Sequence, residues 1–246
     1  MLDRVLEPEV MNTAAEAIDY NQMDHSQVNK LFVDDFLLAF THTTRPRQYP
    51  LRVFDAGTGT ALIPIELLRR GLQAVVTASD LADQMLIVAK QNVSDEGLQG
   101  SIELVLRDCK QLPDSDESYD AVMSNSIVHH IPDPTLVFNE LWRVLKPGGL
   151  LFVRDLMRPD NARTLEHLVQ VYAGVANAHQ QQMFRDSLHA ALTVTDVREL
   201  TVKLGIPAEA IQATSDRHWT LKAYKRPAPS LNSTQVPLRF ADHKNI

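Results

Sequence analysis

The chain has 246 residues, of which 44% are hydrophobic and 22% charged, with a formal net charge of -7 and one cysteine. This composition is that of a soluble globular protein, and the length suits one α/β domain with an added segment better than two full domains. The negative charge opposes binding to a phosphate backbone, so no nucleic-acid partner is expected. The lone Cys109 excludes an internal disulfide, and the first residues lack the apolar core of a signal peptide. A cytoplasmic protein without a membrane anchor is therefore expected, with no prediction of its oligomeric state.

Two helices are predicted before Leu51, over Ala14–Tyr20 and Gln27–Phe40, the second capped by Ser26. The positions expected on one face of the second helix are Val28, Leu31, Phe32, Asp35, Phe36 and Ala39. The polar and aromatic link from Tyr20 to His25 has two interpretations, a lid over a pocket or a surface connector.

The stretch from Leu51 to Thr60 predicts a strand, a tight turn and the start of a helix. The apolar run Leu51–Phe54 suits a buried parallel strand, and it ends at Asp55. Gly57 and Gly59 follow, and glycine lets the backbone approach a ligand without a Cβ in the way. The predicted helix, Thr60–Arg70, would point its N-terminus at that ligand. The turn is therefore expected to bind something small and polar.

The ligand can be narrowed from the residues of the turn. The dinucleotide fingerprint needs a third glycine where this chain has Leu62, which weakens a nicotinamide interpretation. Asp55 would repel a pyrophosphate but suits a ligand that carries an ammonium group and a sulfonium. Asp55, Gly57 and Gly59 resemble motif I of the class I S-adenosylmethionine-dependent methyltransferases, and Thr60 stands where many members have a further glycine. A purely structural turn between strand and helix stays open as the alternative.

Two further strands are each followed by an acid. Ala74–Ala78 is followed by Asp80, and Ile102–Leu106 by Asp108. Because the carboxyl ends of parallel strands meet at one edge of a sheet, these acids and Asp55 are expected to lie together, where open α/β folds bind ligands. The resemblance implies that Asp80 accepts the ribose hydroxyls and that Asp108 accepts the adenine amino group.

The resemblance continues through the fourth and fifth strands. Tyr119–Met123 leads into a segment with His129 and His130, as in the small-molecule branch of the family, which includes quinone-ring C-methyltransferases. The Leu-x-Pro-Gly-Gly signature, Leu145–Gly149, precedes the strand Leu150–Val153. The Asn-Pro-Pro-Tyr/Phe signature of enzymes that methylate nucleobase or glutamine amines is missing from the sequence. What the resemblance implies is a doubly wound, seven-stranded, mostly parallel Rossmann-like sheet, with the sixth strand parallel and the seventh antiparallel.

The predicted organisation has three parts. Residues 1–50 form an N-terminal helical lid segment, residues 51–226 the S-adenosylmethionine-binding domain and residues 227–246 an extended tail. The remaining predicted elements are a helical insertion over Asn161–Leu192, a helix from Thr193 to Leu204 closed by Gly205, and two strands over Ala210–Thr214 and Trp219–Tyr224.

Three groups of site residues are predicted from these positions. Those expected at S-adenosylmethionine are Asp55, Ala56, Gly57, Thr58, Gly59, Asp80, Leu81, Met85, Asp108, Cys109, Asn125 and Ser126. Those expected at a polar, anionic small-molecule substrate are His130, Arg154, Arg217 and His218. Candidates for a general base or orienting group are His129 first, then Asp155, Tyr20 and His25. A histidine packed as a structural residue is the alternative for His129, and no spacing predicts a metal site.

The function expected is methyl transfer from S-adenosylmethionine to a small molecule by in-line displacement, accelerated mainly by positioning. Two alternatives stay open. One is a nicotinamide-dependent oxidoreductase, and the other is a non-catalytic domain that binds the ligand and acts through a partner.

Overall fold

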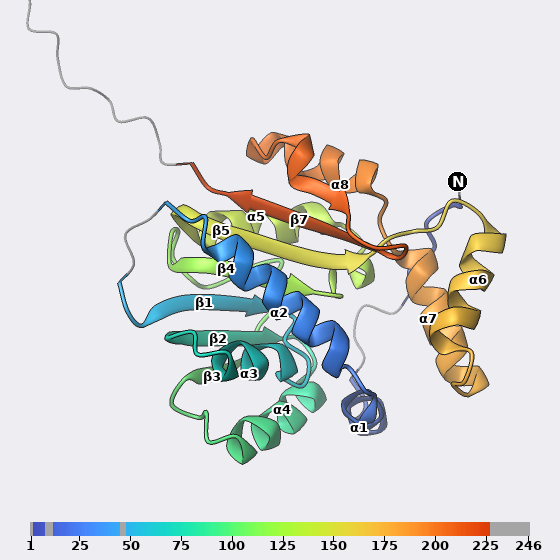
Figure 1. The fold of residues 1–246 in the computed structure, drawn as a ribbon, viewed down its shortest axis with the longest axis horizontal. Helices are drawn as coiled ribbons and strands as arrows, with labels where there is room; N and C mark the ends of the chain where they lie inside the picture. The colour runs from blue at the N-terminus through green and yellow to red at the C-terminus, as the bar shows by residue number, and fades with distance from the viewer. Residues whose placement is uncertain (1, 8–11, 45–47, 227–246) are drawn as a thin grey trace, which may run out of the picture.

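A seven-stranded sheet forms the centre of the molecule (Figure 1), in the order β3-β2-β1-β4-β5-β7-β6. The computed structural model describes residues 2–7, 12–44 and 48–226. The strands are β1 (Leu51–Ala56), β2 (Ala74–Asp80), β3 (Ile102–Leu106), β4 (Tyr119–Asn125), β5 (Leu145–Leu156), β6 (Ile211–Ala213) and β7 (His218–Tyr224). Neighbours among β1–β5 pair in parallel, whereas β7 is antiparallel to both β5 and β6. The predicted doubly wound, mostly parallel sheet with a reversed seventh strand is confirmed.

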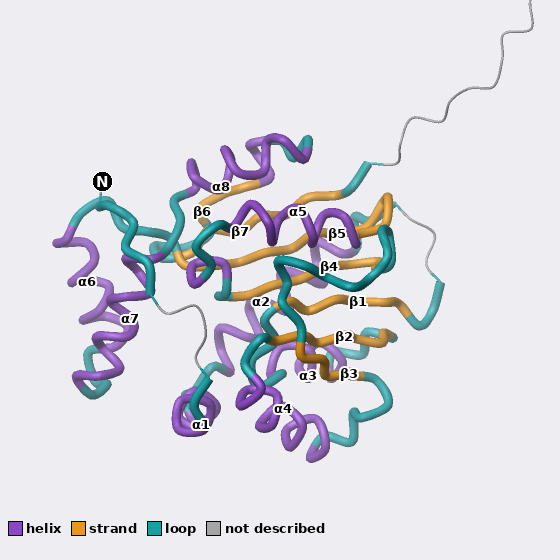
Figure 2. Tube along the Cα trace, turned by 180° about the vertical axis from the view of Figure 1, so that it is seen from behind, coloured by secondary structure: helices purple, strands orange, loops and turns teal. Residues whose placement is uncertain are grey.

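Helices cover both faces of this sheet. They are α1 (Ala14–Gln22), α2 (Ser26–Phe40), α3 (Leu62–Arg69), α4 (Asp83–Asp95), α5 (Pro134–Val144), α6 (Ala162–Ala173), α7 (Ala178–Ala190) and α8 (Val194–Thr201). Apolar side chains of α2, α3 and α4 pack on one face, and those of α5 and α8 on the other. Figure 2, seen from behind, shows α5 on the face opposite to α2 and α3. This is the layering that right-handed crossovers between parallel strands produce.

The fifth strand is longer than predicted at both ends. A register shift in its pairing with β4 separates Leu145 from Leu150, so the Pro-Gly-Gly segment lies within the irregular start of β5. The strand continues through Asp155 to Leu156, paired with β7. Arg154 and Asp155 are therefore strand residues and not loop residues, and their side chains leave opposite faces of the sheet.

The two N-terminal helices differ in detail from the prediction. Ser26 is the first residue of α2 and not its cap; the N-cap is His25, and Asp24 Oδ1 accepts from the Ser26 N–H at 3.0 Å. Val28 and Leu31, which were placed on the buried face, are 42% and 54% exposed. The stripe that packs on β5 consists of Phe32, Val33, Phe36, Ala39 and Phe40. Phe32, Phe36 and Ala39 were thus predicted correctly, whereas Val33 and Phe40 take the places expected for Val28 and Leu31 in the buried stripe.

The helical insertion lies beyond the carboxyl end of β5 (Figure 1). As predicted, residues 161–192 are mostly helical, and Asn161 caps α6 by accepting from the Thr164 N–H at 3.0 Å. Leu165, Leu168 and Leu188 form a small separate core between α6 and α7, against which Leu2 packs. The first residues of the chain thus lie against an insertion more than 150 positions later in the sequence.

Thr193 caps α8, a short turn over Val202–Leu204 follows, and Gly205 ends it with a φ of 71°. The last two strands are confirmed with slightly shifted ends. The predicted tail, residues 227–246, lies outside the described residues. Among the residues that the structure does describe, no helix combines the length and apolar character needed to cross a bilayer.

Candidate functional site

The three predicted acids come together at one edge of the sheet. Asp55 lies at the end of β1, Asp80 at the end of β2 and Asp108 two residues after β3, and these strands are neighbours. Asp80 and Asp108 line a large pocket at this edge, and Asp55 lines a smaller cavity. The two spaces adjoin, because Tyr20, Gly57 and Asn125 line both.

The Gly-rich turn fixes the shape of this edge. Gly57 has a φ of +72°, and a Cβ added there would lie 2.2 Å from Ile127 Cγ2, so only glycine fits. Its N–H donates to Ser79 O at 2.9 Å, which ties the turn to β2. The Gly59 N–H, from a residue with a φ of +55°, donates to Asp80 Oδ2 at 2.7 Å. The turn and Asp80 are therefore held in fixed relation before any ligand binds.

Asp55 is a buried carboxyl group with one oxygen left unpaired. It is 2% exposed, and Oδ2 has no hydrogen-bond partner among the described residues. Burial raises the pKa of Asp55 to about 7, the Thr58 hydroxyl opposes this shift, and the nearby Asp80 adds to it. Leaving a buried carboxylate oxygen unpaired is costly, so the site favours a ligand that brings a positive charge and N–H donors.

The large pocket contains most of the residues predicted for the cofactor. Its lining residues are Tyr20, Gly57, Gly59, Asp80, Leu81, Ala82, Met85, Arg107, Asp108, Cys109, Lys110, Asn125, Ser126, Ile127, His130 and Ile131. Thr58 lies with Asp55 in the smaller cavity. Ala56 lines neither space; it is fully buried, and its carbonyl accepts from the Ser124 hydroxyl at 2.9 Å. Burial raises the pKa of the Cys109 thiol to about 12, so it stays protonated.

Tyr20 and His25 lie on the N-terminal side of the pocket. The Tyr20 ring lines both spaces, and its Cε1 is 3.7 Å from the point where a Cβ on Gly59 would lie. The His25 ring packs on the Tyr20 ring with centroids 4.4 Å apart, and its Nε2 is 2.9 Å from Tyr20 O. Tyr20 thus lies next to the Gly-rich turn, while His25 packs on Tyr20 and does not line the pocket itself.

His129 and Asp155 form a buried pair behind the pocket wall. His129 Nδ1 lies 2.5 Å from Asp155 Oδ1, and Asp155 also accepts from the backbone N–H groups of Val128 and Leu156, each at 2.6 Å. Burial disfavours the charged imidazole, but Asp155 outweighs it and the pKa of His129 is raised. His129 Nε2 faces Glu7 Oε1 at 3.5 Å. Its neighbour His130 does line the pocket, as predicted for a substrate contact.

The other predicted substrate residues lie away from this pocket. Arg154 projects from the face of β5 that α2 covers, where it binds Asp35 and donates to Thr220 Oγ1 at 3.0 Å. Arg217 stacks on the ring of Tyr172 in α6, 3.4 Å from its centroid. Burial and the neighbouring Arg217 lower the pKa of His218 to about 4. Arg217 and His218 thus border the helical insertion, at the β7 side of the same edge.

Several lining residues were not identified in the sequence. Asn29 of α2 lines the smaller cavity, while Arg107, Lys110 and Ile127 line the large pocket. Arg107, Lys110 and Ile127 directly neighbour predicted positions, and extending each strand-end motif by one residue would have found them. Asn29 had no such signal, because its place depends on how α2 crosses the edge.

Fold and site together define a class of protein: a seven-stranded sheet with a reversed last strand, a Gly-rich turn after β1 and an acid at each of three adjacent strand ends. Residues 54–153 match the family described as "Methyltransferase domain". Over these residues the chain is similar to methyltransferase domains, which agrees with the resemblance to the class I S-adenosylmethionine-dependent methyltransferases that the sequence predicted.

Individual relatives agree with this assignment. Methyltransferase GfsG of Streptomyces halstedii is 34% identical over 43% of this chain and 38% of its own length. A demethylmenaquinone methyltransferase of Deinococcus radiodurans is 38% identical over 45% of each chain. The matches thus span less than half the length of these curated relatives. A crystal structure of a SAM-dependent methyltransferase from Aquifex aeolicus shares the fold, with a TM-score of 0.59, 17% identity, and 85% of this chain and 97% of that one covered.

Proposed function

We propose that this chain transfers the methyl group of S-adenosylmethionine to a polar small molecule. The observation that carries the proposal is the buried, unpaired Oδ2 of Asp55 beside a pocket that Asp80 and Asp108 line. An ammonium group would supply the missing charge and donors. A nucleoside with an amino-acid tail matches this row of acceptors better than a pyrophosphate does, because three carboxylates repel phosphate. The nicotinamide alternative gains no support from the fold or the relatives.

Each acid would hold one part of the cofactor. Asp55 would bind the ammonium group, Asp80 the ribose hydroxyls and Asp108 the adenine amino group. Asp80 already accepts from the N–H groups of Gly59 and Ala82, but each carboxylate oxygen has a second acceptor site for a hydroxyl. When bound, the sulfonium supplies an electrophilic methyl group. The chain's own contribution is then to hold donor and acceptor in line and to exclude water.

The acceptor would enter past His130 and Ile131, two of the lining residues that follow β4. These residues come from the 3-10 helix over Val128–His130 and the loop after it. The role of general base predicted for His129 is not part of this proposal, because its two ring nitrogens face Asp155 and Glu7 and not the pocket. Arg217 and His218 remain candidates for acceptor contacts on the β7 side.

We also propose that the chain acts in the cytoplasm and that its substrate is not a nucleic acid. A cytoplasmic place of action fits the single cysteine, and the net charge of -7 disfavours a nucleic-acid substrate. We also propose the domain division expected from the sequence, an N-terminal segment over residues 1–50 and a catalytic unit over residues 51–226.

Calorimetric titration of the full chain with S-adenosylhomocysteine and, separately, with NAD tests the cofactor. Saturable binding of the first alone is expected, and binding of NAD alone would contradict the proposal. Transfer of a labelled methyl group to a panel of hydroxylated aromatics, quinols and small carboxylates then tests the acceptor. The demethylmenaquinone methyltransferase relative makes quinols a natural part of this panel. Cofactor binding without transfer to any acceptor would instead favour the non-catalytic alternative.

A further inference from the structure

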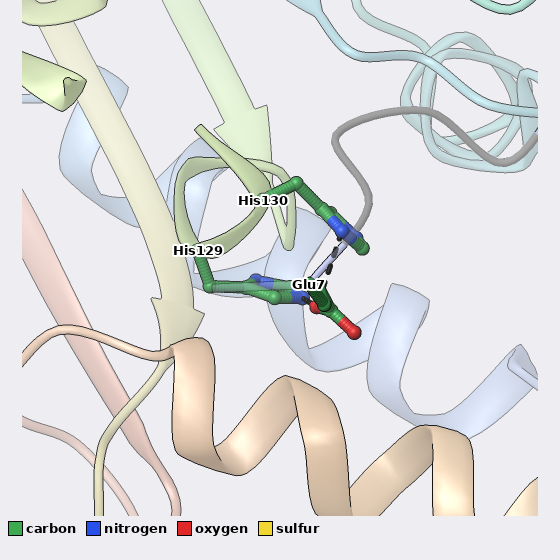
Figure 3. Close-up of side chains that lie close together, drawn as sticks. All are labelled: Glu7, His129 and His130. Atoms are coloured by element: carbon green, nitrogen blue, oxygen red, sulfur yellow. Dashed lines mark ion pairs between the residues drawn. The ribbon is translucent and has the colours of Figure 1, made fainter. Parts of the chain in front are cut away.

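Three side chains with metal-binding atoms converge behind the pocket wall. Glu7 comes from the N-terminal segment, and His129 and His130 come from the 3-10 helix after β4 (Figure 3). Glu7 Oε1 lies 3.1 Å from His130 Nδ1 and 3.5 Å from His129 Nε2. All three atoms lie within 4.8 Å of one another. The cluster is outside the row of acids assigned to the cofactor.

These separations match those between the ligands of one small ion. Zinc binds imidazole nitrogen and carboxylate oxygen at about 2.0–2.2 Å in tetrahedral geometry, which places two ligand atoms about 3.3 Å apart. The two oxygen–nitrogen distances, 3.1 and 3.5 Å, lie on either side of that value. The two imidazole nitrogens, at most 4.8 Å apart, would have to move closer together to bind the same ion.

The ligand atoms are already oriented. Asp155 binds His129 Nδ1, so Nε2 faces Glu7 and would offer its lone pair to an ion that displaces the Nε2 proton. A carboxylate behind a metal-bound imidazole is the usual partner that fixes its tautomer and raises its basicity. Glu7 is supported too, because its Oε2 accepts from the Ser187 hydroxyl of α7 at 3.2 Å. Its Oε1, by contrast, has no hydrogen-bond partner among the described residues.

The surrounding charge also suits a cation. The charged groups acting on His129 are the carboxylates of Glu7 and Asp155 and one guanidinium, that of Arg4. Arg4 is directed at backbone oxygens, including those of His129 and Ile131 at 3.1 and 2.9 Å. Two carboxylates against one guanidinium leave a net negative environment at His129.

We propose that Glu7, His129 and His130 bind one divalent transition-metal ion, with zinc the best match to two imidazoles and a carboxylate. Three protein ligands leave a fourth position for water or another oxygen ligand. The ion would join the N-terminal segment to the helix that carries His130 into the pocket wall. The sequence predicted no metal site, because Glu7 lies more than 120 positions from the histidine pair and no local spacing relates them.

The test uses the full chain without a histidine tag, freed of metal with a chelator and dialysed. Zinc is titrated in competition with a chromophoric chelator, and bound metal is counted by elemental analysis. We expect one zinc per chain and a rise in melting temperature on zinc addition. Cobalt in place of zinc should give the intense visible absorption of a tetrahedral site.

Glu7→Gln and His130→Gln should each weaken zinc binding at least about tenfold and remove the rise in melting temperature. The matched controls are Glu199→Gln and His179→Gln, exposed residues of α8 and α7, which should bind zinc as the unaltered chain does. Circular dichroism and a cooperative urea transition in the presence of a chelator show that each variant is folded. The proposal would be overturned if the unaltered chain failed to bind one zinc per chain, or if the Glu7 and His130 variants bound zinc as tightly as the unaltered chain. Neither outcome would bear on the proposed binding of S-adenosylmethionine.

Discussion

Asp155, the penultimate residue of β5, binds His129: Asp155 Oδ1 lies 2.5 Å from His129 Nδ1, and both side chains are buried. Burial opposes ionisation of this carboxyl, yet His129 and the N–H groups of Val128 and Leu156 hold its pKa below the ordinary value. One carboxylate thus connects β5 to the 3-10 helix whose His130 lines the pocket. The pair is a positioning element, because neither ring nitrogen of His129 faces the pocket.

Asp155→Asn is expected to destabilise the chain by about 3 kcal/mol, since removing one partner of a buried ion pair leaves the other uncompensated. The measurement is urea denaturation at neutral pH in the presence of a metal chelator. Asp35→Asn is the matched control, because Asp35 pairs with Arg154 at the surface, with a side chain 52% exposed. Such a pair contributes less than about 1 kcal/mol. Equal losses in the two variants would show that Asp155 has no special place in the fold.

Asp55→Asn is expected to change ligand affinity and stability in opposite directions. Losing a charge-assisted hydrogen bond of about 1.5–3 kcal/mol should weaken S-adenosylhomocysteine binding about 10- to 150-fold. The ligand-free variant should be at least as stable as the unaltered chain at pH 8, because it no longer buries an unpaired carboxylate. Calorimetry and thermal melting check the two effects. Loss of both affinity and stability would instead indicate a structural role for Asp55.

The pH dependence of cofactor binding follows from the same group. The pKa of Asp55 is raised to about 7 in the ligand-free fold, so a proton competes with the ammonium group below that pH. The apparent dissociation constant of S-adenosylhomocysteine should rise about tenfold per pH unit below 7. Asp55→Asn should remove this slope. A slope that persists in the variant would assign the titration to another residue.

The stability of the ligand-free chain should depend on pH in the opposite direction to cofactor binding, and should fall as the pH rises. The folded-state pKa of Asp55 lies above the ordinary value of 3.8, so the folded chain holds this proton more tightly than the unfolded chain does. The stabilisation is complete below pH of about 4 and is lost as the pH rises through about 7. Melting of the ligand-free chain between these limits checks the sign, and Asp55→Asn again serves as the control.

The sequence was sufficient to predict the row of acids, for a physical reason. Asp55, Asp80 and Asp108 each follow an apolar run that has only one way to be buried, as a parallel strand, and parallel strands end at a common edge. Local pattern and overall fold therefore agree at these positions. The same holds for the glycines of the turn, since Gly57 and Gly59 both adopt positive φ.

Arg154 shows where the pattern was insufficient. The sequence analysis predicted a fifth strand that ends at Val153. It therefore placed Arg154 and Asp155 in a loop, together on the substrate side. Pairing with β7 extends β5 to Leu156, and side chains alternate along a strand. Arg154 therefore points toward α2 and Asp155 toward His129. Only the strand's true end, which depends on β7, could have decided this.

The contacts of residues 2–7 had no signal in the sequence. Arg4 donates to the carbonyl groups of His129, Ile131, Pro132 and Ala190, and Glu7 approaches the two histidines. These contacts join residues 2–7 to positions far along the chain, and neither charge periodicity nor propensity encodes such distant pairing. Tertiary packing against α7 decides it.

Gly57→Ala should damage the cofactor site more than any other glycine substitution in a left-handed turn. Its Cβ would lie 2.2 Å from Ile127 Cγ2, and a left-handed φ alone costs a non-glycine residue about 1–3 kcal/mol. Gly71→Ala is the matched control, because Gly71 has a φ of +85° with nothing within 4 Å of an added Cβ. Both variants should lose stability in urea denaturation, but only Gly57→Ala should also lose S-adenosylhomocysteine binding, since Ile127 lines the pocket. Unchanged binding in Gly57→Ala would mean that the turn accommodates the methyl group without displacing Ile127 in the pocket. Glycine would then be needed at position 57 only for its positive φ.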